Sequence, residues 1–198
     1  EQVIAGYPSE DLVLWEGFVD AQWEELQRFA ATTRAFRFPT VFSLGLTVRD
    51  GDLLYNSVAA VCAGEILGIV PKEKLPTYGV FYEGRVFAEG TPGRVSDIGD
   101  IPFGDLIFQF PFGVVSLEVC EDLWTPEGPM RRRAYSGAEL VINASASPWR
   151  VGVIEQRKAM ISARATDNLA TVVYVNQVGA NDSLVYDGGG FIHQNRDW

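Results

Sequence analysis

The stretch that most constrains this chain is residues 113–124, GVVSLEVCEDLW. It begins as an apolar run with β-branched residues, which is typical of a buried strand, and Cys120 follows at the strand's end. A cysteine where a buried strand opens into a loop lies at the rim of a sheet, where α/β folds usually place their chemistry. Free cysteine is also among the most buried residue types, so a packed structural thiol is the alternative at this point.

Composition and charge exclude several classes of function. The chain has 198 residues, 47% of them hydrophobic, which is enough for one domain with its own core. The net charge of -10, with no basic run longer than Arg131–Arg133, argues against binding to nucleic acid or to an anionic membrane. Two cysteines make no disulfide framework and no apolar run reaches transmembrane length, so we expect a cytoplasmic protein. A single histidine, His193, gives no basis for a metal site.

The first part of the sequence predicts one helix followed by an antiparallel meander. Ser9 is placed to cap a helix that runs to about Arg34, with apolar positions recurring every three or four residues. Strands are predicted at 40–48, 54–63 and 65–70, joined by glycine-containing turns. Residues 71–93 have no periodic pattern, and a loop of this length inside a domain is often functional.

The second part of the sequence predicts alternating strands and helices. The predicted elements are a hairpin at 105–110 and 113–120, a short helix at 129–136, strands at 137–144 and 171–176, a helix at 152–168, a loop at 179–190 and a last strand from Phe191. This order favours a layered α/β or α+β fold in which helices cover sheets.

A cysteine nucleophile needs a group that takes its proton and donors that hold an oxyanion. His193 is one possible base for Cys120, although we interpret it as a structural or surface residue. A carboxylate in a dry pocket can also act as a base, and a lysine can supply positive charge. The candidates are therefore Glu1, Glu83 and the lysines of the 71–93 loop, and the residues alone do not choose among them. We interpret Arg131–Arg133 as a solvated helix face.

Four blocks spread over nearly the whole chain carry a common signature. They are GYPSEDL at 6–12; YN at 55–56 with LG at 67–68 and KEKLPTYGVFYE at 72–83; VCEDLW at 119–124; and NASASP at 143–148 with Arg157, Arg164-Ala165, YVN at 174–176 and DGG at 187–189. With these blocks the sequence resembles the nitrilase superfamily of carbon–nitrogen hydrolases. It is most similar to the glutaminase domain of glutamine-dependent NAD synthetases.

The resemblance implies roles for individual residues. Glu1 falls on the family's base, Lys72 on its catalytic lysine and Cys120 on its nucleophile, whereas Lys74 does not align. Glu83 matches a second glutamate that helps to hold the lysine and the substrate.

By the same matching, Tyr78, Trp124 and Ser147 line a glutamine pocket, and the backbone N–H of Glu121 stabilises the oxyanion together with Lys72. No cofactor or metal is implied for this domain. ATP and Mg²⁺ are expected only in the synthetase domain, which this chain lacks.

The implied fold is a nitrilase-like four-layer α-β-β-α sandwich, formed by a single glutaminase domain over residues 1–198. We expect it to be incomplete at both ends, without the family's first strand–helix unit and its C-terminal strands. If Glu1 is a true terminus, its free ammonium should lower the pKa of the neighbouring carboxyl group and make it a weaker base.

The implied function is hydrolysis of the glutamine side-chain amide through a cysteine thioester. The ammonia would pass to a synthetase domain that amidates deamido-NAD with ATP. The implied partners are glutamine, that synthetase domain and further copies of the protein in a homo-oligomer. Two alternatives stay open: a stand-alone amidase of the superfamily that acts on another small amide, and a catalytically inert fragment.

Overall fold

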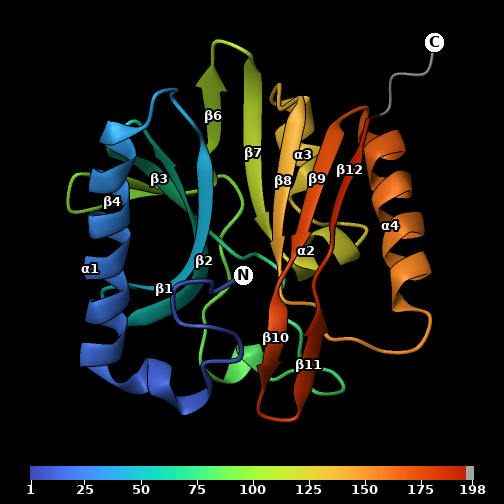
Figure 1. Ribbon diagram of the computed structural model, residues 1–198, viewed down its shortest axis with the longest axis horizontal. Coiled ribbons are helices and arrows are strands. Elements are labelled where there is room, and N and C mark those ends of the chain that lie inside the picture. Colours follow the sequence, from blue (N-terminus) through green and yellow to red (C-terminus); the bar gives the residue numbers. More distant parts are fainter. Residues whose placement is uncertain (195–198) are drawn as a thin grey trace.

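In the computed structural model, which describes residues 1–194, two five-stranded sheets pack face to face between helices (Figure 1). The first sheet contains, in spatial order, β1 (Phe42–Asp50), β2 (Leu53–Cys62), β3 (Glu65–Pro71), β5 (Ile101–Gly104) and β4 (Val95–Ile98). The second contains β12 (Gly190–His193), β9 (Thr171–Asn176), β8 (Leu140–Ser145), β7 (Gly113–Val119) and β6 (Ile107–Phe110). The predicted α-β-β-α sandwich is confirmed, while residues 195–198 of the predicted domain lie outside the described residues.

Helix α1 covers the outer face of the first sheet, and the other helices cover the outer face of the second (Figure 1). The helices are α1 (Glu16–Thr32), α2 (Glu121–Trp124), α3 (Met130–Tyr135) and α4 (Val153–Asn168), with 3-10 helices at Glu10–Leu14, Thr33–Ala35 and Glu83–Arg85. Among residues 1–194, no helix is long and apolar enough to cross a membrane.

The central strand β2 is buried on both faces, which explains its nearly continuous run of small and apolar residues. Val58 and Ala60 pack toward the second sheet, in a core shared with Leu117 of β7. Tyr55 and Ala59 point the other way, into the core under α1. Successive side chains of β2 therefore point into two different cores, so that this one strand packs against the layers on both of its sides.

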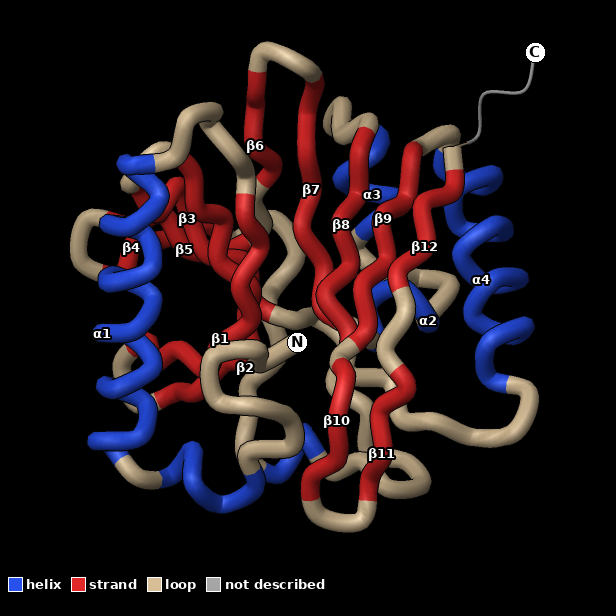
Figure 2. The backbone as a smooth tube through the Cα atoms, viewed as in Figure 1, coloured by secondary structure: helices blue, strands red, loops and turns tan. Residues whose placement is uncertain are grey.

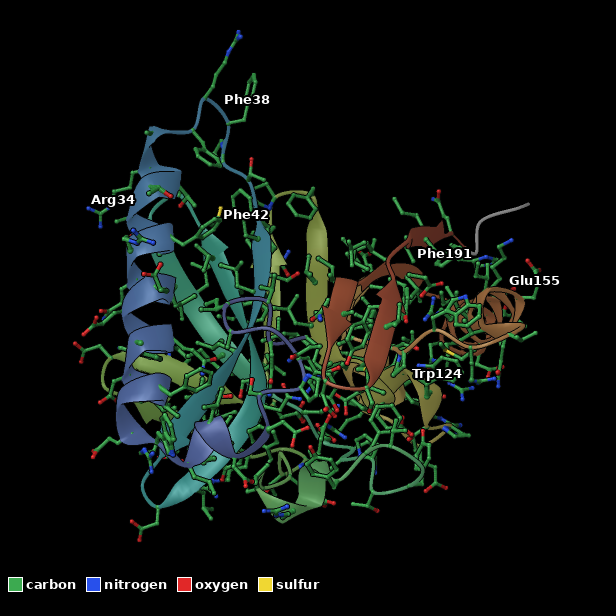
Figure 3. All side chains as sticks on the ribbon, turned by 60° about the horizontal axis from the view of Figure 1, so that its bottom comes forward. Arg34, Phe38, Phe42, Trp124, Glu155 and Phe191 are labelled. Atoms are coloured by element: carbon green, nitrogen blue, oxygen red, sulfur yellow. The ribbon has the colours of Figure 1, made fainter. Side chains whose placement is uncertain are left out.

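The apolar stripe of α1 docks on the first sheet and fixes the outer layer. Leu26 and Ala30 are buried there, and burial of one such leucine contributes roughly 2 kcal/mol. Phe42 at the start of β1 lies beside α1 (Figure 3), with its ring centroid 5.2 Å from that of Phe29. This contact packs the start of β1 against the helix.

The segments that follow three parallel strands of the second sheet lie at the same edge of that sheet. β7, β8 and β9 are paired in parallel register, with Val119 opposite Ala144 and Ser145 opposite Asn176. The residues that follow these strand ends therefore meet at the same edge of the sheet. The antiparallel hairpin of β10 (Val178–Asn181) and β11 (Leu184–Asp187) extends beyond that edge (Figure 2).

The first residues of the chain run between the two sheets, where the N-terminus is seen in Figure 1. The N–H of Ile4 donates to the carbonyl of Gly45 in β1, 3.3 Å away. A Cβ atom at Gly45 would lie only 2.3 Å from the backbone nitrogen of Gln2. A glycine at this position of β1 therefore allows the N-terminal segment, and with it Glu1, to enter the interior.

The predicted single helix at the N-terminal end is interrupted. A 3-10 helix at Glu10–Leu14 ends at Trp15, whose extended backbone (φ -85°, ψ 117°) separates it from α1. The predicted cap by Ser9 is wrong, because its hydroxyl donates instead to Gln2 Oε1 at 2.7 Å and contacts the carbonyl of Gly6 at 2.9 Å. Tertiary hydrogen bonds to the N-terminal segment replace the local cap.

Two further predictions are corrected by the structure, and one stretch without a prediction contains strands. The predicted loop at 179–190 contains the β10–β11 hairpin, whose turn at Asp182-Ser183 lacks the glycine that usually signals such a turn. Residues 94–104, for which no element was predicted, contain β4 and β5. The predicted solvated face of Arg131–Arg133 is wrong for Arg133, which is only 2% exposed, whereas Arg131 is exposed.

Replacing Gly45 with alanine should disturb the N-terminal segment. The new Cβ would overlap the backbone of Gln2, so we expect the free energy of unfolding to fall by about 1–3 kcal/mol. Urea unfolding measures this change. Gly17→Ala in α1 is the matched control, because no atom lies within 4 Å of its new Cβ and alanine favours a helix. Equal midpoints for the two variants would contradict the close approach at Gly45.

Candidate active site

Cys120 occupies the turn between β7 and α2 with an unusual backbone conformation. Its φ of 42° and ψ of -97° are sterically unfavourable for a residue with a side chain. The conformation is held by two backbone hydrogen bonds, from the Cys120 N–H to the carbonyl of Ala144 and from the Leu123 N–H to the carbonyl of Cys120, both 3.0 Å. The thiol-bearing residue is thus fixed at the sheet edge and is 5% exposed.

A buried lysine joins two buried glutamates beside this turn. Lys72, directly after β3, is completely buried and donates from Nζ to Glu1 Oε1 at 2.6 Å and to Glu83 Oε1 at 2.8 Å. Its backbone N–H donates to the carbonyl of Asn56 in β2 at 2.8 Å. The N-terminal segment and the 71–93 loop, which are distant in the sequence, therefore meet at one ammonium group.

Hydrogen bonds from neighbouring residues orient the two carboxylates. Asn56 Nδ2 donates to Glu1 Oε1 at 2.7 Å, and the N–H of Ala146 donates to Glu1 Oε2 at 3.1 Å. Tyr7 Oη donates to Glu83 Oε1 at 2.8 Å. Tyr7 and Asn56 lie in the sequence blocks described above but were not predicted as site residues, because nothing in the sequence shows that their side chains reach the glutamates.

The two glutamates have opposite pKa shifts. Burial raises the pKa of Glu1, but the charge of Lys72, with hydrogen bonds from Lys72 and Asn56, outweighs burial and lowers it. For Glu83, burial exceeds the effect of Lys72 and, with repulsion from Glu1, raises the pKa to about 7. The pKa of Lys72 is raised because its two carboxylate neighbours outweigh the effect of burial. At neutral pH, Glu1 and Lys72 form an ion pair.

The thiol of Cys120 lies within the electrostatic reach of this group. Burial and the negative charges of Glu1 and Glu83 raise its pKa, while Lys72 and a hydrogen bond with Ser145 act in the opposite direction. In the resting protein Cys120 is therefore a neutral thiol. The site combines a thiol, a carboxylate that can accept a proton and a buried cation, which are the groups that nucleophilic catalysis requires.

A cavity of about 150 Å³ opens onto Cys120. At about 30 Å³ for each water molecule, it has room for a small organic molecule. Four of the predicted site residues besides Cys120 line it: Tyr78, Glu121, Trp124 and Ser147. Val80, Phe81, Pro148 and Arg150 complete the lining and were not predicted. Figure 3 shows Trp124 at the lower ends of the strands, on the side of the second sheet.

Neighbouring residues hold the cavity wall in place. Tyr78 Oη donates to Glu121 Oε2 at 2.8 Å and so joins the 71–93 loop to the turn after Cys120. The side chain of Asn176 hydrogen-bonds both the N–H and the carbonyl of Ser147, at 2.8 and 3.1 Å. Arg157 from α4 donates to the same carbonyl at 2.7 Å and pairs with Asp187.

Asp122 is a buried residue of the site whose role was not predicted. Its Oδ1 accepts hydrogen bonds from the N–H groups of Glu73 and Lys74, at 3.0 and 2.9 Å, and its Oδ2 accepts one from Val119 at 3.1 Å. Asp122 therefore links the segment that follows Lys72 to both sides of Cys120. The sequence placed this acid next to Cys120, but only the fold shows that it faces the segment after Lys72.

Glu118 is completely buried two residues before Cys120. Neither of its carboxylate oxygens has a hydrogen-bond partner. Burial, opposed by Arg133 and reinforced by Asp122 and Glu73, raises its pKa to about 8. At neutral pH Glu118 is therefore predominantly protonated, an uncharged group among charged ones.

The structure separates His193 from the site. His193 ends β12 opposite Val172 near the start of β9, whereas the residues around Cys120 follow the opposite end of that parallel sheet. The alternative base considered for Cys120 is therefore not in position. Within residues 1–194, no group of three His, Cys, Asp or Glu side chains could hold a metal ion.

Comparison with known sequences gives consistent matches along the chain. The profile of the family described as carbon-nitrogen hydrolase matches residues 1–196. The glutamine-dependent NAD(+) synthetase of Aquifex aeolicus is 37% identical over 188 residues, and that of Thermotoga maritima is 38% identical over 198 residues. These alignments cover 95% and 97% of this chain but only 30% and 31% of the relatives. The chain thus spans less than a third of their length.

Solved structures with the same arrangement of layers include a synthetase and an amidase. A glutamine-dependent NAD(+) synthetase from Cytophaga hutchinsonii matches with a TM-score of 0.84 and 29% identity, covering 94% of this chain and 31% of that one. An amidase from Nesterenkonia sp. matches with a TM-score of 0.74 and 24% identity, covering 94% of this chain and 64% of that one. The amidase shares the fold.

The protonated state of Glu118 should appear in the pH dependence of stability. Between its ordinary pKa of 4.5 and its raised value of about 8, the unfolded chain loses this proton while the folded chain retains it. Stability therefore falls as pH rises through this window, by up to roughly 5 kcal/mol at about 1.4 kcal/mol per pKa unit. Glu118→Gln removes this contribution, so its stability relative to the wild type should increase from pH 5 to pH 8.

Denaturant unfolding at several pH values measures this effect. The same series on Glu24→Gln, which changes an exposed carboxyl group on α1, gives the background. A stability difference for Glu118→Gln that stays constant from pH 5 to pH 8 would show that Glu118 is ionised in the folded protein.

Proposed function

We propose that this chain, which belongs to the carbon–nitrogen hydrolase family, hydrolyses the side-chain amide of glutamine. The observation that carries the proposal is the buried group of Glu1, Lys72 and Glu83. It lies beside Cys120, and Cys120 lines a cavity. The choice of glutamine is supported by the relatives, which are named glutamine-dependent NAD(+) synthetases.

In the first step Cys120 attacks the side-chain amide carbon. The thiol proton moves to Glu1, a carbon–sulfur bond forms, and the carbonyl oxygen becomes an oxyanion. Lys72 and the backbone N–H of Glu121 stabilise that oxyanion. The N–H of Glu121 suits this role because it lies in the first turn of α2, where N–H groups have no partner within the helix.

The pKa values determine the order of events in this step. Because the pKa of Glu1 is lowered and the pKa of Cys120 is raised, a free thiolate is rare in the resting site. Proton transfer therefore accompanies attack on the amide instead of preceding it. The nascent oxyanion draws on the charge of Lys72 as it forms, which loosens the ion pair with Glu1 and makes Glu1 a stronger base.

The remaining steps release both products. Protonated Glu1 gives its proton to the amide nitrogen, the carbon–nitrogen bond breaks, and ammonia leaves a thioester on Cys120. Water then attacks the thioester, Glu1 accepts a proton from that water, and the proton returns to the departing sulfur. Glutamate is released and the thiol is restored, so the net reaction consumes one water molecule for each amide.

The cavity residues are assigned to substrate binding. Tyr78, Glu121, Trp124 and Ser147 surround the space beside the Cys120 sulfur, and we assign the glutamine to this space. Glu83 accepts a second hydrogen bond from the Lys72 ammonium, besides the one to Glu1. In this scheme Glu83 supports catalysis through the position of Lys72.

The destination of the ammonia is part of the same proposal. Residues 1–198 act as a single glutaminase domain, and the ammonia passes to a synthetase domain that amidates deamido-NAD with ATP and Mg²⁺. The names of the relatives, and the share of their length that lies outside the matched region, support this assignment. A homo-oligomer is the assembly that we expect for the intact protein.

Removing the nucleophile or the cation should abolish glutamine hydrolysis. We expect no measurable glutamate from Cys120→Ser and at least a 100-fold lower kcat for Lys72→Ala, since loss of one oxyanion donor costs about 10²–10³ in rate. Glutamate release by the intact natural protein is measured with glutamate dehydrogenase.

Lys74→Ala is the matched control for Lys72→Ala. The backbone of Lys74 contacts Asp122, but its side chain is not part of the buried group. Because Lys72→Ala leaves two buried carboxylates without their cation, rates are normalised to the folded fraction. Undiminished turnover by the Lys72→Ala protein would refute the mechanism.

Substrate selectivity distinguishes the proposal from its alternatives. We expect glutamine to be hydrolysed with a kcat/KM at least tenfold above that for propionamide or asparagine. Hydrolysis of simple amides with glutamine left intact would favour a stand-alone amidase. A folded protein that hydrolyses none of these compounds would favour an inert domain.

A further inference from the structure

A second group of charged residues is buried close to the active site. Arg132 and Arg133 on α3 pair with Glu73 in the 71–93 loop and with Asp105 between β5 and β6. We call these four residues the arginine cluster. Both carboxylates are more than nine-tenths buried, and Arg133 is 2% exposed, so the cluster belongs to the interior.

Arg133 is the member of the cluster that also touches the strand leading to Cys120. Its Nη1 donates to the carbonyl of Leu117 in β7 at 2.6 Å, and its Nε donates to Asp105 Oδ1 at 2.8 Å. Its Nη2 donates to Glu73 Oε1 at 3.2 Å. One guanidinium group thus connects three separate segments.

The segments that Arg133 connects carry the reactive groups. Glu73 is the residue after Lys72, and Leu117 lies three residues before Cys120. Asp122 makes a second connection between the same two segments through backbone N–H groups. Hydrogen bonds of Arg133 and of Asp122 therefore both join the segment that follows Lys72 to the segment around Cys120.

We propose that Arg133 is a positioning residue that fixes the Lys72 ammonium relative to the Cys120 sulfur. It does so by anchoring Glu73 to the backbone of β7. The inference rests on the proposed function for its consequence in turnover, but its geometric part concerns only the two reactive side chains.

The requirement is for arginine and not merely for positive charge. Three hydrogen bonds in three directions need the planar fork of a guanidinium group, which a lysine ammonium on a flexible stem does not reproduce. Arg132 provides an internal comparison. It pairs with the same Glu73 and Asp105, but its side chain is 36% exposed and it makes no described bond to β7.

The expected effects follow from a small displacement of Lys72. A misplacement of about 1 Å can cost on the order of 100-fold in rate, so a partial displacement should lower kcat roughly tenfold. The cavity residues are not part of the arginine cluster, so KM should change less than twofold. A less well placed Lys72 also lowers the pKa of Cys120 less effectively, which slows alkylation of the thiol.

The test compares Arg133→Lys with Arg132→Lys in the intact protein, both in a Cys62→Ser background that leaves Cys120 as this chain's single thiol. The readouts are the rate of Cys120 alkylation by iodoacetamide at pH 8 and the kcat and KM for glutamine per alkylatable site. For Arg133→Lys we expect alkylation several-fold slower and a tenfold lower kcat at similar KM. For Arg132→Lys we expect both rates within twofold of the parent.

The outcomes separate this inference from the proposed function. Alkylation is independent of glutamine, so a protein that ignores glutamine but shows slow alkylation in Arg133→Lys alone refutes the function and supports the positioning role. Equal alkylation rates in the two lysine variants overturn the positioning role. A purely structural role would lower the number of alkylatable sites and leave the rate of each site unchanged.

Glu73→Gln tests the same connection if Arg133→Lys does not fold. It keeps an acceptor oxygen but removes the charge that Arg133 holds. We expect the same slower alkylation, and unchanged alkylation would overturn the inference.

Discussion

The ion pairs of Lys72 are the interaction on which the rest of the structure depends. An ammonium group without solvent is tolerated only when charges and hydrogen bonds compensate it, and Glu1 and Glu83 supply them. The ion pair with Glu1 holds the first residues of the chain between the sheets. The contacts of Lys72 and Glu83 hold the 71–93 loop near β2. Because removing one partner would leave a buried charge unpaired, the groups that could perform chemistry also hold distant segments of the fold together.

The layers of the fold were predicted from the sequence and are confirmed, whereas the contacts around the candidate site residues were not predicted. β2 and β7 were predictable because a buried strand leaves an apolar pattern, and Lys72 and Cys120 because the resemblance assigns them. The roles of Asp122 and Arg133 were not predictable, because a charged residue is expected to be solvated unless its partners are known. Those partners lie in other segments. The β10–β11 hairpin was missed because its turn lacks glycine.

Burial shifts the pKa values of several carboxyl groups around Cys120, and not only the pKa of the thiol. Glu1, Glu83 and Glu118 are all buried carboxyl groups, yet the pKa of the first is lowered and the pKa values of the other two are raised. Lys72 stabilises the charge of Glu1, while Glu118 has no hydrogen-bond partner. Three carboxyl groups of the same type therefore differ in proton affinity within one small region: Lys72 outweighs burial at Glu1, burial and repulsion from Glu1 outweigh Lys72 at Glu83, and burial dominates at Glu118.

The hydrogen bond from Ala146 to Glu1 joins residues 145 positions apart. Contacts of such separation form late, because the intervening chain must be ordered before they are gained. During synthesis Glu1 leaves the ribosome well before Ala146 and the strands that support it. The group of Glu1, Lys72 and Cys120 is therefore complete only once almost the entire domain has folded, and a partly made chain carries Cys120 without the base and the cation that the proposed reaction requires.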